Sequence, residues 1–237
     1  MTMLLPRQKL KREFALDPSL VLYLPLYELD GVAFTSKDHY GHLATVTGAV
    51  WRPDGRSFDG TDDNVTVPDC AGLSGLSAMT VMAWGKTNTW VVGTCLASKY
   101  WHANLREWYL SVTGAGNPSS PKFVVFDETA GANLSISPTA TINLFTDDWF
   151  CLMACWGGAT DGSDMELDIN GVNQPVTVTP TGVFVNIDDT VQDVLIGEIG
   201  NLARDYNGLI GEFAQWNVKK TMKERQDIYL NTRWRYR

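Results

Sequence analysis

Cysteine and histidine are both scarce in this sequence of 237 residues, with four of the first and three of the second. Cys151 and Cys155 lie four residues apart on one expected strand, roughly 13 Å between their Cα atoms, which is beyond the reach of a disulfide. We therefore expect all four cysteines to be reduced, and we exclude a fold held together by disulfides. The histidines stand outside the Gly-x-Ser-x-Gly and His-Glu-x-x-His patterns, so we assign them no catalytic role.

Long apolar runs are also missing. No window of the sequence approaches eighteen consecutive apolar residues, so a membrane-spanning helix is not expected. Residues 1–19 contain neither the apolar core nor the cleavage pattern of a signal peptide, so we expect the chain to be made in the cytoplasm. The sequence has no Walker loop, no Gly-x-Gly-x-x-Gly turn after a strand and no Cys-x-x-Cys pair.

What the sequence does contain is a series of short segments with the two-residue period of β-strands. Leucines occupy alternate positions in residues 20–26, so one face of that strand is all leucine. Trp149–Trp156 is apolar on both faces, which indicates a central strand covered on each side. Asn170-Gly171 predicts a tight hairpin after Met165–Asn170. Thr221 and Glu224 have the spacing of a capping box and predict a single helix at about residues 221–231.

An acidic turn is the most distinctive local feature. In Ser57–Pro68, Gly60 lies among Asp59, Asp62 and Asp63, and an alternating run with Val65 and Val67 on one face follows. We interpret the segment as a β-hairpin in which glycine supplies the positive φ of the turn. The three carboxylates repel one another unless water, backbone N–H groups or a cation neutralises them.

This segment and those around it resemble the laminin-G-like jelly rolls of the concanavalin A-like lectin and glucanase superfamily. The similarity extends over roughly residues 20–232. It is carried by Val21–Glu28, Asp38–His42, Ser57–Pro68, Met79–Trp84, Leu96–Lys99, Trp108–Val112, Asp148–Val172, Val194–Gly197 and Tyr206–Tyr229. The resemblance implies an all-β, antiparallel two-sheet jelly-roll sandwich over residues 20–237, preceded by a basic N-terminal arm at residues 1–19. It does not specify the function, because that family includes lectins, adhesion modules, coat components and enzymes.

The resemblance also implies a calcium site where the acidic turn meets the last strand. The matching positions are the carbonyl of Gly60 and the carboxylates of Asp62 and Glu212. Glu212 is suspect in its own right, because strand alternation places it in an apolar row where a lone carboxylate is costly. It needs either calcium or an ion pair with an arginine such as Arg56. Glu28 is a further candidate ligand, together with Asp30 in the same segment.

Aromatic residues between positions 88 and 108 suggest a glycan-binding site. Sugar C–H surfaces stack on aromatic rings, while their hydroxyls need amides and carboxylates. The candidates near expected loop ends are Trp90, Tyr100, Trp101, His102 and Asn104. Trp90 and Trp101 are the preferred pair, whereas Trp108 begins an alternating strand and is expected in the core.

An enzymatic alternative rests on Glu166, Asp168 and Asn170. Laminarinase-type glycoside hydrolases of the same superfamily carry Glu-x-Asp-x-Glu on one strand, which aims three acids into a cleft. Here the third acid is replaced by asparagine, which removes the proton donor for the leaving group. A solvated polar strand face explains the pattern better, so we do not expect an enzyme.

Charge is distributed unevenly along the chain. Residues 1–13 carry four basic side chains against one acid, and residues 219–237 carry seven against two, although the whole chain has a net charge of −8. The acidic body disfavours nucleic acid and membrane surfaces as partners. The basic termini suit self-association into homo-oligomers or contact with capsid or tail proteins, although a solvated terminus explains them equally.

These features together predict a non-enzymatic recognition or assembly module. A lectin-like surface or structural component of a bacteriophage virion, in capsid decoration or tail adhesion, reconciles a recognition fold with the missing export signal. The alternatives are a free carbohydrate-binding module and a laminarinase-like glycoside hydrolase. The expected partner is a glycan or a protein surface.

Overall fold

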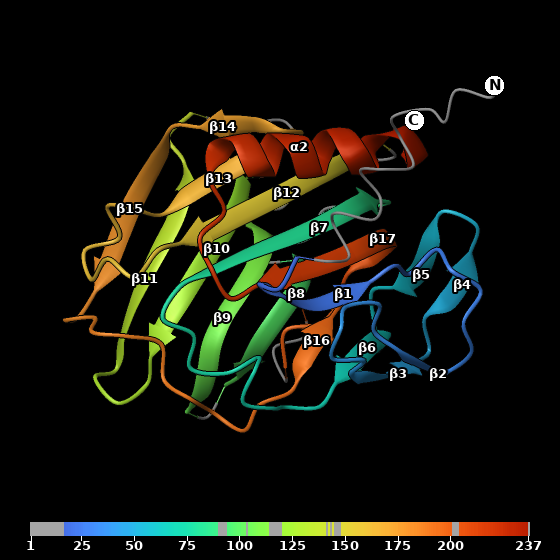
Figure 1. Ribbon diagram of the computed structural model, residues 1–237, viewed down its shortest axis with the longest axis horizontal. Helices are drawn as coiled ribbons and strands as arrows, with labels where there is room; N and C mark the ends of the chain where they lie inside the picture. Colours follow the sequence, from blue (N-terminus) through green and yellow to red (C-terminus); the bar gives the residue numbers. More distant parts are fainter. Residues whose placement is uncertain are drawn as a thin grey trace.

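The computed structural model describes residues 17–89, 94–102, 104–113, 120–140, 142, 144, 148–200 and 204–236, and shows two antiparallel sheets stacked face to face (Figure 1). Sheet A has the order β14-β13-β12-β7-β17-β5-β4, and β1 pairs with β17 beside β5. Its strands are β1 (Leu20–Leu24), β4 (Val50–Arg52), β5 (Gly55–Asp59), β7 (Met79–Thr87), β12 (Trp149–Trp156), β13 (Glu166–Ile169), β14 (Val172–Gln174) and β17 (Asn207–Trp216).

Sheet B has the order β15-β11-β10-β9-β8-β16-β6-β3-β2. Its strands are β2 (Ala33–Thr35), β3 (Leu43–Thr47), β6 (Asn64–Val67), β8 (Thr94–Trp101), β9 (Leu105–Thr113), β10 (Ser120–Asp127), β11 (Ala132–Pro138), β15 (Val176–Thr181) and β16 (Val194–Ile196). Helix α2 (Met222–Thr232) and the 3₁₀ turn η1 (Arg233–Arg235) end the described chain. The predicted all-β sandwich with one C-terminal helix is therefore confirmed.

The core between the sheets is built by strand alternation. Leu22, Leu24 and Leu26 fill this core, as do Val65 and Val67 of β6, but an irregularity between Leu20 and Leu22 turns Leu20 to the opposite face, so the predicted all-leucine face is wrong at Leu20. Trp108 stacks on Phe213 of the opposite sheet, with their ring centroids 6.1 Å apart. All four cysteines are free, as predicted. Among the described residues, no helix combines the length and the apolar character needed to cross a membrane.

The prediction of a hairpin at the acidic turn is wrong. β5 belongs to sheet A, where it pairs with β4 and β17, whereas β6 belongs to sheet B, where it pairs with β3 and β16. Gly60 does take the positive φ of a turn, +83°. The turn therefore carries the chain from one sheet to the other, because local sequence sets the reversal but distant strands compete as partners. In contrast, the hairpin at Asn170-Gly171 is confirmed, with φ values of +51° and +74°.

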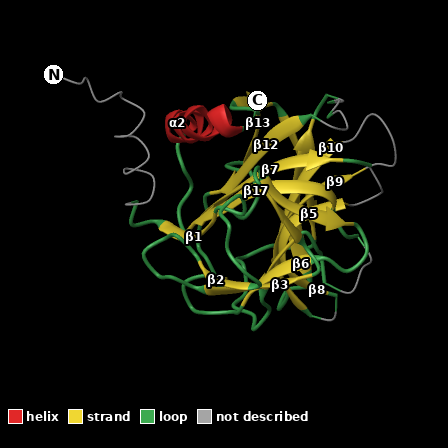
Figure 2. Cartoon of the chain, turned by 90° about the vertical axis from the view of Figure 1, so that its right-hand side faces the viewer, coloured by secondary structure: helices red, strands yellow, loops and turns green. Residues whose placement is uncertain are grey.

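Helix α2 covers the outer face of sheet A, on the side away from sheet B (Figure 2). β12 is consequently buried on both faces, as predicted: Leu152 points into the sandwich and Met153 toward the layer beneath the C-terminal segment. Trp84 of β7 donates from Nε1 to Thr232 Oγ1 at 2.9 Å and stacks on Tyr229 with centroids 5.6 Å apart. The helix thus closes one outer surface of the protein.

The inner side of α2 is organised by a charge. The predicted capping box is present, since Glu224 N donates to Thr221 Oγ1 at 3.3 Å and Thr221 N to Glu224 Oε2 at 2.8 Å. Met222 is 49% exposed, whereas Arg225, 1% exposed, faces the sheet together with Ile228 and Thr232. Arg225 donates from Nε and Nη2 to both oxygens of Asp168, at 2.7 and 3.1 Å, and its Nη2 also bonds Glu166.

We predict that Arg225→Ala lowers the free energy of unfolding by about 3–5 kcal/mol, because it leaves the buried Asp168 carboxylate without its counter-charge. Urea denaturation followed by tryptophan fluorescence measures this. The control is Lys223→Ala, which removes an exposed ion pair with Asp227 and should leave the free energy of unfolding nearly unchanged. A loss below 1 kcal/mol for Arg225→Ala, about that of a surface change, would contradict the assignment.

Candidate ligand-binding site

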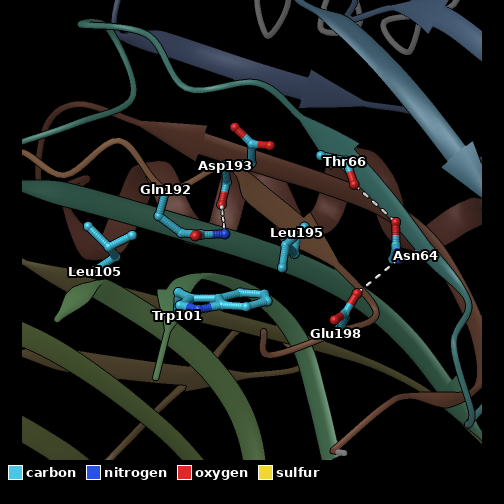
Figure 3. Close-up of a pocket in the computed structure, with 8 residues that line it drawn as sticks. All are labelled: Asn64, Thr66, Trp101, Leu105, Gln192, Asp193, Leu195 and Glu198. Carbon is cyan, nitrogen blue, oxygen red and sulfur yellow. Dashed lines mark hydrogen bonds between the residues drawn. The ribbon is translucent and has the colours of Figure 1, made fainter. Parts of the chain in front are cut away.

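A hollow of about 450 Å³ lies on the outer face of sheet B (Figure 3). Strand β6, the end of β8, the start of β9, strand β16 and the segments on either side of β16 contribute to it. It is lined by Asn64, Thr66, Trp101, Leu105, Gln192, Asp193, Leu195 and Glu198. Its lining is an exposed indole and two leucines surrounded by amide, hydroxyl and carboxylate groups.

Strand alternation explains why polar groups reach this surface. In β6, Val65 and Val67 fill the core, so Asn64 and Thr66 must point outward. In the neighbouring β16, Val194 and Ile196 join the core and leave Leu195 on the outer face. Two adjacent strands thus present an amide, a hydroxyl and an apolar patch side by side.

The polar side of the hollow is held in a fixed arrangement. Thr66 Oγ1 donates to Asn64 Oδ1 at 3.0 Å, and Asn64 Nδ2 donates to Glu198 Oε2 at 2.9 Å (Figure 3). The chain of bonds sets the orientation of the Asn64 amide. Burial, together with repulsion from Asp205, raises the pKa of Glu198 above its ordinary value.

Trp101 supplies the aromatic surface. It ends β8 and is 39% exposed, and its ring lies in the hollow below Leu195 in Figure 3. Gly200 approaches the backbone of this strand end so closely that a Cβ there would lie 2.4 Å from the Tyr100 carbonyl oxygen and 3.1 Å from the Trp101 ring. A glycine is therefore required where the chain after Glu198 passes the indole.

Beneath one wall of the hollow lies a buried ion-pair cluster. Lys99 Nζ is 2.7 Å from Asp69 Oδ1 and 3.2 Å from Glu107 Oε1, and Lys99 is fully buried. Lys99 also donates to the backbone carbonyls of Thr190 and Gln192, and Glu107 Oε1 accepts from the Thr190 N–H at 2.9 Å. These bonds fix the segment that carries Gln192 and Asp193 into the hollow. Burial raises the pKa of Glu107, although Lys99 opposes the shift.

The structure separates the five predicted ligand residues. Trp101 lines the hollow, whereas Trp90 lies outside the described residues. Tyr100 is buried on the same face of the sheet, with its ring centroid 5.4 Å from that of Phe126. His102 and Asn104 are exposed in the β8–β9 turn and are not among the lining residues of the hollow.

Sequence reasoning did not identify the rest of the lining. The alternation of β6 contains a usable signal for Asn64 and Thr66, because each residue between two core valines must face outward. No comparable signal exists for Gln192 and Asp193, which the fold brings in from a segment without strand character.

The acidic turn forms a second cluster. One carboxylate oxygen from each of Asp59, Asp62 and Asp63 lies within 4.8 Å of the others. Asp63 accepts from the Asp59 N–H at 2.8 Å and sits over Gly48, where a Cβ would come within 1.8 Å of its Oδ1. Burial, with repulsion from Asp59 and Asp62, raises the pKa of Asp63. Asp205 is shifted the same way by the same causes.

The structure does not bring Glu212 to this turn. The turn meets β17 at Asn207, whose Nδ2 donates to the Asp59 carbonyl at 2.9 Å, and Glu212 lies five residues farther, about 16 Å along a strand. Strand alternation places Ile210 and Glu212 on the same face of β17, but a bulge between them breaks this pattern. Ile210 therefore points into the core and Glu212 to the opposite face. Gly60 and Asp62 remain together in the turn itself.

Glu212 has partners on the side of sheet A that the C-terminal segment covers. Tyr23 donates to its Oε2 at 2.6 Å, and Arg235 Nη1 lies 3.7 Å from its Oε1. An arginine does pair with this carboxylate, but the suggested Arg56 does not, because it donates instead to the carbonyls of Asp30 and Gly31.

The remaining two acidic candidates share one lysine. Lys37 Nζ lies 3.5 Å from Glu28 and 3.7 Å from Asp30. These carboxylates belong to the segment after β1, and they are not part of the cluster formed by the acidic turn.

The row that suggested a hydrolase faces α2. Asp168 is 1% exposed and bound by Arg225, and Glu166 pairs with Lys219 at 2.6 Å. The pKa of Glu166 is lowered: burial alone would raise it, but hydrogen bonds from Lys219 and Arg225 outweigh burial. Asn170 lies in the hairpin turn. A glycosidase needs two carboxyl groups open to a cleft, and this row does not provide the pair, because Asp168 is buried under α2 and Glu166 is engaged by Lys219 and Arg225.

Comparison with known families agrees with this architecture. The profile described as the concanavalin A-like lectin/glucanases superfamily matches residues 59–224, most of the chain. The chain belongs to this superfamily. Among curated protein sequences, none matches it.

Several solved structures have a fold similar to that of this concanavalin A-like chain over most of its length. The binding domain of Paraclostridial Mosquitocidal Protein 1 has a TM-score of 0.66 and 12% identity, with 89% of this chain and 52% of that chain covered. The botulinum neurotoxin serotype G binding domain has a TM-score of 0.65 and 14% identity, with 89% and 50% covered. Our chain therefore spans about half the length of these two.

A third similar structure is a single small domain. Domain 4 of AbnA, a GH43 extracellular arabinanase from Geobacillus stearothermophilus, solved with arabinotriose, has a TM-score of 0.64 and 15% identity. The similarity covers 89% of this chain and 98% of that domain. At these identities the three similarities establish a shared fold.

Proposed function

We propose that this concanavalin A-like domain is a non-enzymatic carbohydrate-binding module whose ligand occupies the hollow on sheet B. The observation that carries the proposal is the exposed ring of Trp101 beside the fixed amide of Asn64 and the carboxylate of Glu198. An indole face packs against the C–H surface of a sugar ring, and the amide and carboxylate satisfy its hydroxyls.

The similar structures support recognition as the general role. Two of them are binding domains, one of a mosquitocidal protein and one of a botulinum neurotoxin, and the third was solved with arabinotriose. The laminarinase-like alternative is not favoured, because the row it relies on is closed by α2 and neutralised by Arg225.

We predict that Trp101→Ala weakens binding to a glycan found on an array by about tenfold or more, since it removes the stacking surface. Isothermal titration calorimetry measures the effect. Trp234→Ala is the matched control, because Trp234 is 47% exposed but lies in η1, outside the hollow. Equal losses in the two variants would argue against this site.

We propose in addition that calcium binds the acidic turn through Asp59, Asp62 and Asp63, with the carbonyl of Gly60. Glu212 is left out of this ligand set because it has its own partners on sheet A. Calcium prefers six to eight oxygen ligands, and three mutually repelling carboxylates within 4.8 Å fit that preference.

We predict that millimolar calcium raises the melting temperature by about 2–4 °C, which corresponds to roughly 1 kcal/mol in a domain of this size. Asp62→Asn should remove most of this response and should be more stable than the natural chain in EDTA, because one repulsive charge is gone. As the pKa of Asp63 is raised, lowering the pH protonates it and the calcium effect should shrink. Asp161→Asn, outside the turn, is the control; an undiminished response in Asp62→Asn would refute the site.

We also propose that the module serves as a component of a larger particle such as a bacteriophage virion, in capsid decoration or tail adhesion. The support for contact with other subunits is the distribution of basic residues at the two termini. The basic side chains of the C-terminal segment are largely used within the chain, in the pairs Lys219–Glu166, Lys220–Asp17, Lys223–Asp227, Arg225–Asp168 and Arg235–Glu212. The basic residues of positions 1–13 are then the main source of positive charge for contact with the acidic body of another subunit.

We predict that deleting residues 1–16 converts multimers of the full chain into monomers in light scattering, with an unchanged melting temperature. Because the attraction is electrostatic, about 0.5 M salt should dissociate the full chain in the same way. Multimers that survive both treatments would locate the contact elsewhere.

A further inference from the structure

The charge of the hollow on sheet B restricts which saccharides it can hold. Among the described residues, its lining contains two carboxylates, Asp193 and Glu198, and no lysine or arginine. The lysine nearest along the lining strands, Lys99, is fully buried and is neutralised by Asp69 and Glu107. The field in the hollow is therefore negative.

The two carboxylates are held differently: Glu198 accepts from Asn64, whereas the carboxylate of Asp193 points away from the indole in Figure 3 and accepts from the Asp69 N–H at 3.0 Å. Figure 3 shows Asp193 and Glu198 on either side of Leu195, with the indole of Trp101 beneath. Asn64 occupies one oxygen of Glu198 and fixes its position, while the segment bearing Asp193 is fixed through Thr190 and Gln192 by the buried Lys99 cluster. Glu198 therefore does not turn away from an occupant without breaking its bond to Asn64, and Asp193 contributes its charge from a fixed position at the edge of the hollow.

More negative charge lies close behind Glu198. Asp205 and Glu198 are near enough to repel each other, and Asp205 in turn feels Asp59 and Asp62 of the acidic turn. An anionic ligand entering the hollow would lose water of hydration next to like charges, which opposes its binding. A cationic group would relieve this repulsion.

We infer that the hollow selects saccharides bearing a protonated amine over neutral ones, and excludes those bearing carboxylates. This inference rests on the proposed carbohydrate-binding function and names its ligand class. The chemistry is an ammonium group beside the Glu198 carboxylate and the indole, where a charge-assisted hydrogen bond and a cation–π contact act together in a field to which Asp193 adds. The sugar ring itself still stacks on Trp101.

The test uses three tetrasaccharides that share the β-1,4 linkage and differ in charge: a glucosamine tetramer, cellotetraose and a β-1,4-glucuronic acid tetramer. Calorimetry with the full chain near neutral pH should give the tightest binding for the amine, weaker by about tenfold for cellotetraose, and none for the uronate. Raising the salt to about 0.5 M should reduce the preference for the amine without affecting cellotetraose.

Variants then assign the preference to the two side chains. Glu198→Gln and Asp193→Asn should each reduce the ratio of the affinity for the amine to that for cellotetraose several-fold, because each removes a negative charge that only the amine uses. Asp227→Asn on α2, an acid outside the hollow, should leave the order of the three ligands unchanged.

The outcomes distinguish failure of the charge selection from failure of the proposed carbohydrate-binding function. Binding that depends on Trp101 but is equal for the three tetrasaccharides, or strongest for the uronate, would overturn the charge selection alone. If none of the three binds, an array of glycans tests the same order of amine, neutral and acidic saccharides. An acidic glycan whose binding is lost in Trp101→Ala would overturn the charge selection. An array with no signal that depends on Trp101 would end both proposals.

Discussion

The contact between Arg225 and Asp168 decides which outer face of the sandwich is covered. It holds α2 over sheet A and leaves the outer face of sheet B open. It brings a cation from α2 onto a carboxylate of β13, both about 1% exposed, and so fixes the helix across sheet A. With that face covered, the acids that suggested a hydrolase become structural partners of the helix. A buried charge pair of this kind adds little net stability over an apolar pair, but losing one partner is costly, which makes the position of the helix specific.

The outer face of sheet B is organised by the same kind of interaction with the opposite result. The buried cluster of Lys99, Glu107 and Asp69 bonds the backbone of the segment that carries Gln192 and Asp193 and fixes it at the edge of the hollow. No described helix covers this face of sheet B. Trp101 therefore remains exposed, and the ligand surface proposed for the module follows from which sheet received the helix. The turn at Asp59–Asp63, which crosses between the sheets, links the two surfaces through the start of β17.

Much of the fold could be predicted from the sequence, because alternation and turn chemistry are local. Leu22 and Leu24 of β1, the two-sided apolar run of β12 and the Asn170-Gly171 turn are of this kind, whereas the irregularity that turns Leu20 to the other face has no local signal. The sheet partners of β5 and β6 could not be predicted, since either strand could pair across a short turn. Arg225 could not be placed either: hydropathy assigns a guanidinium to solvent, and only its partners on another strand make burial favourable. The hollow was predicted through Trp101 alone, because its other walls come from distant segments.

The central claim is that the open face of sheet B, and not the helix-covered face of sheet A, receives the ligand. A crystal structure of the domain soaked with cellotetraose or the glucosamine tetramer tests it most directly. The account predicts a sugar ring lying against the indole of Trp101, with hydroxyl or amine groups within hydrogen-bond distance of Asn64, Asp193 or Glu198. An oligosaccharide bound beside α2 on sheet A, with Trp101 bare, would contradict it.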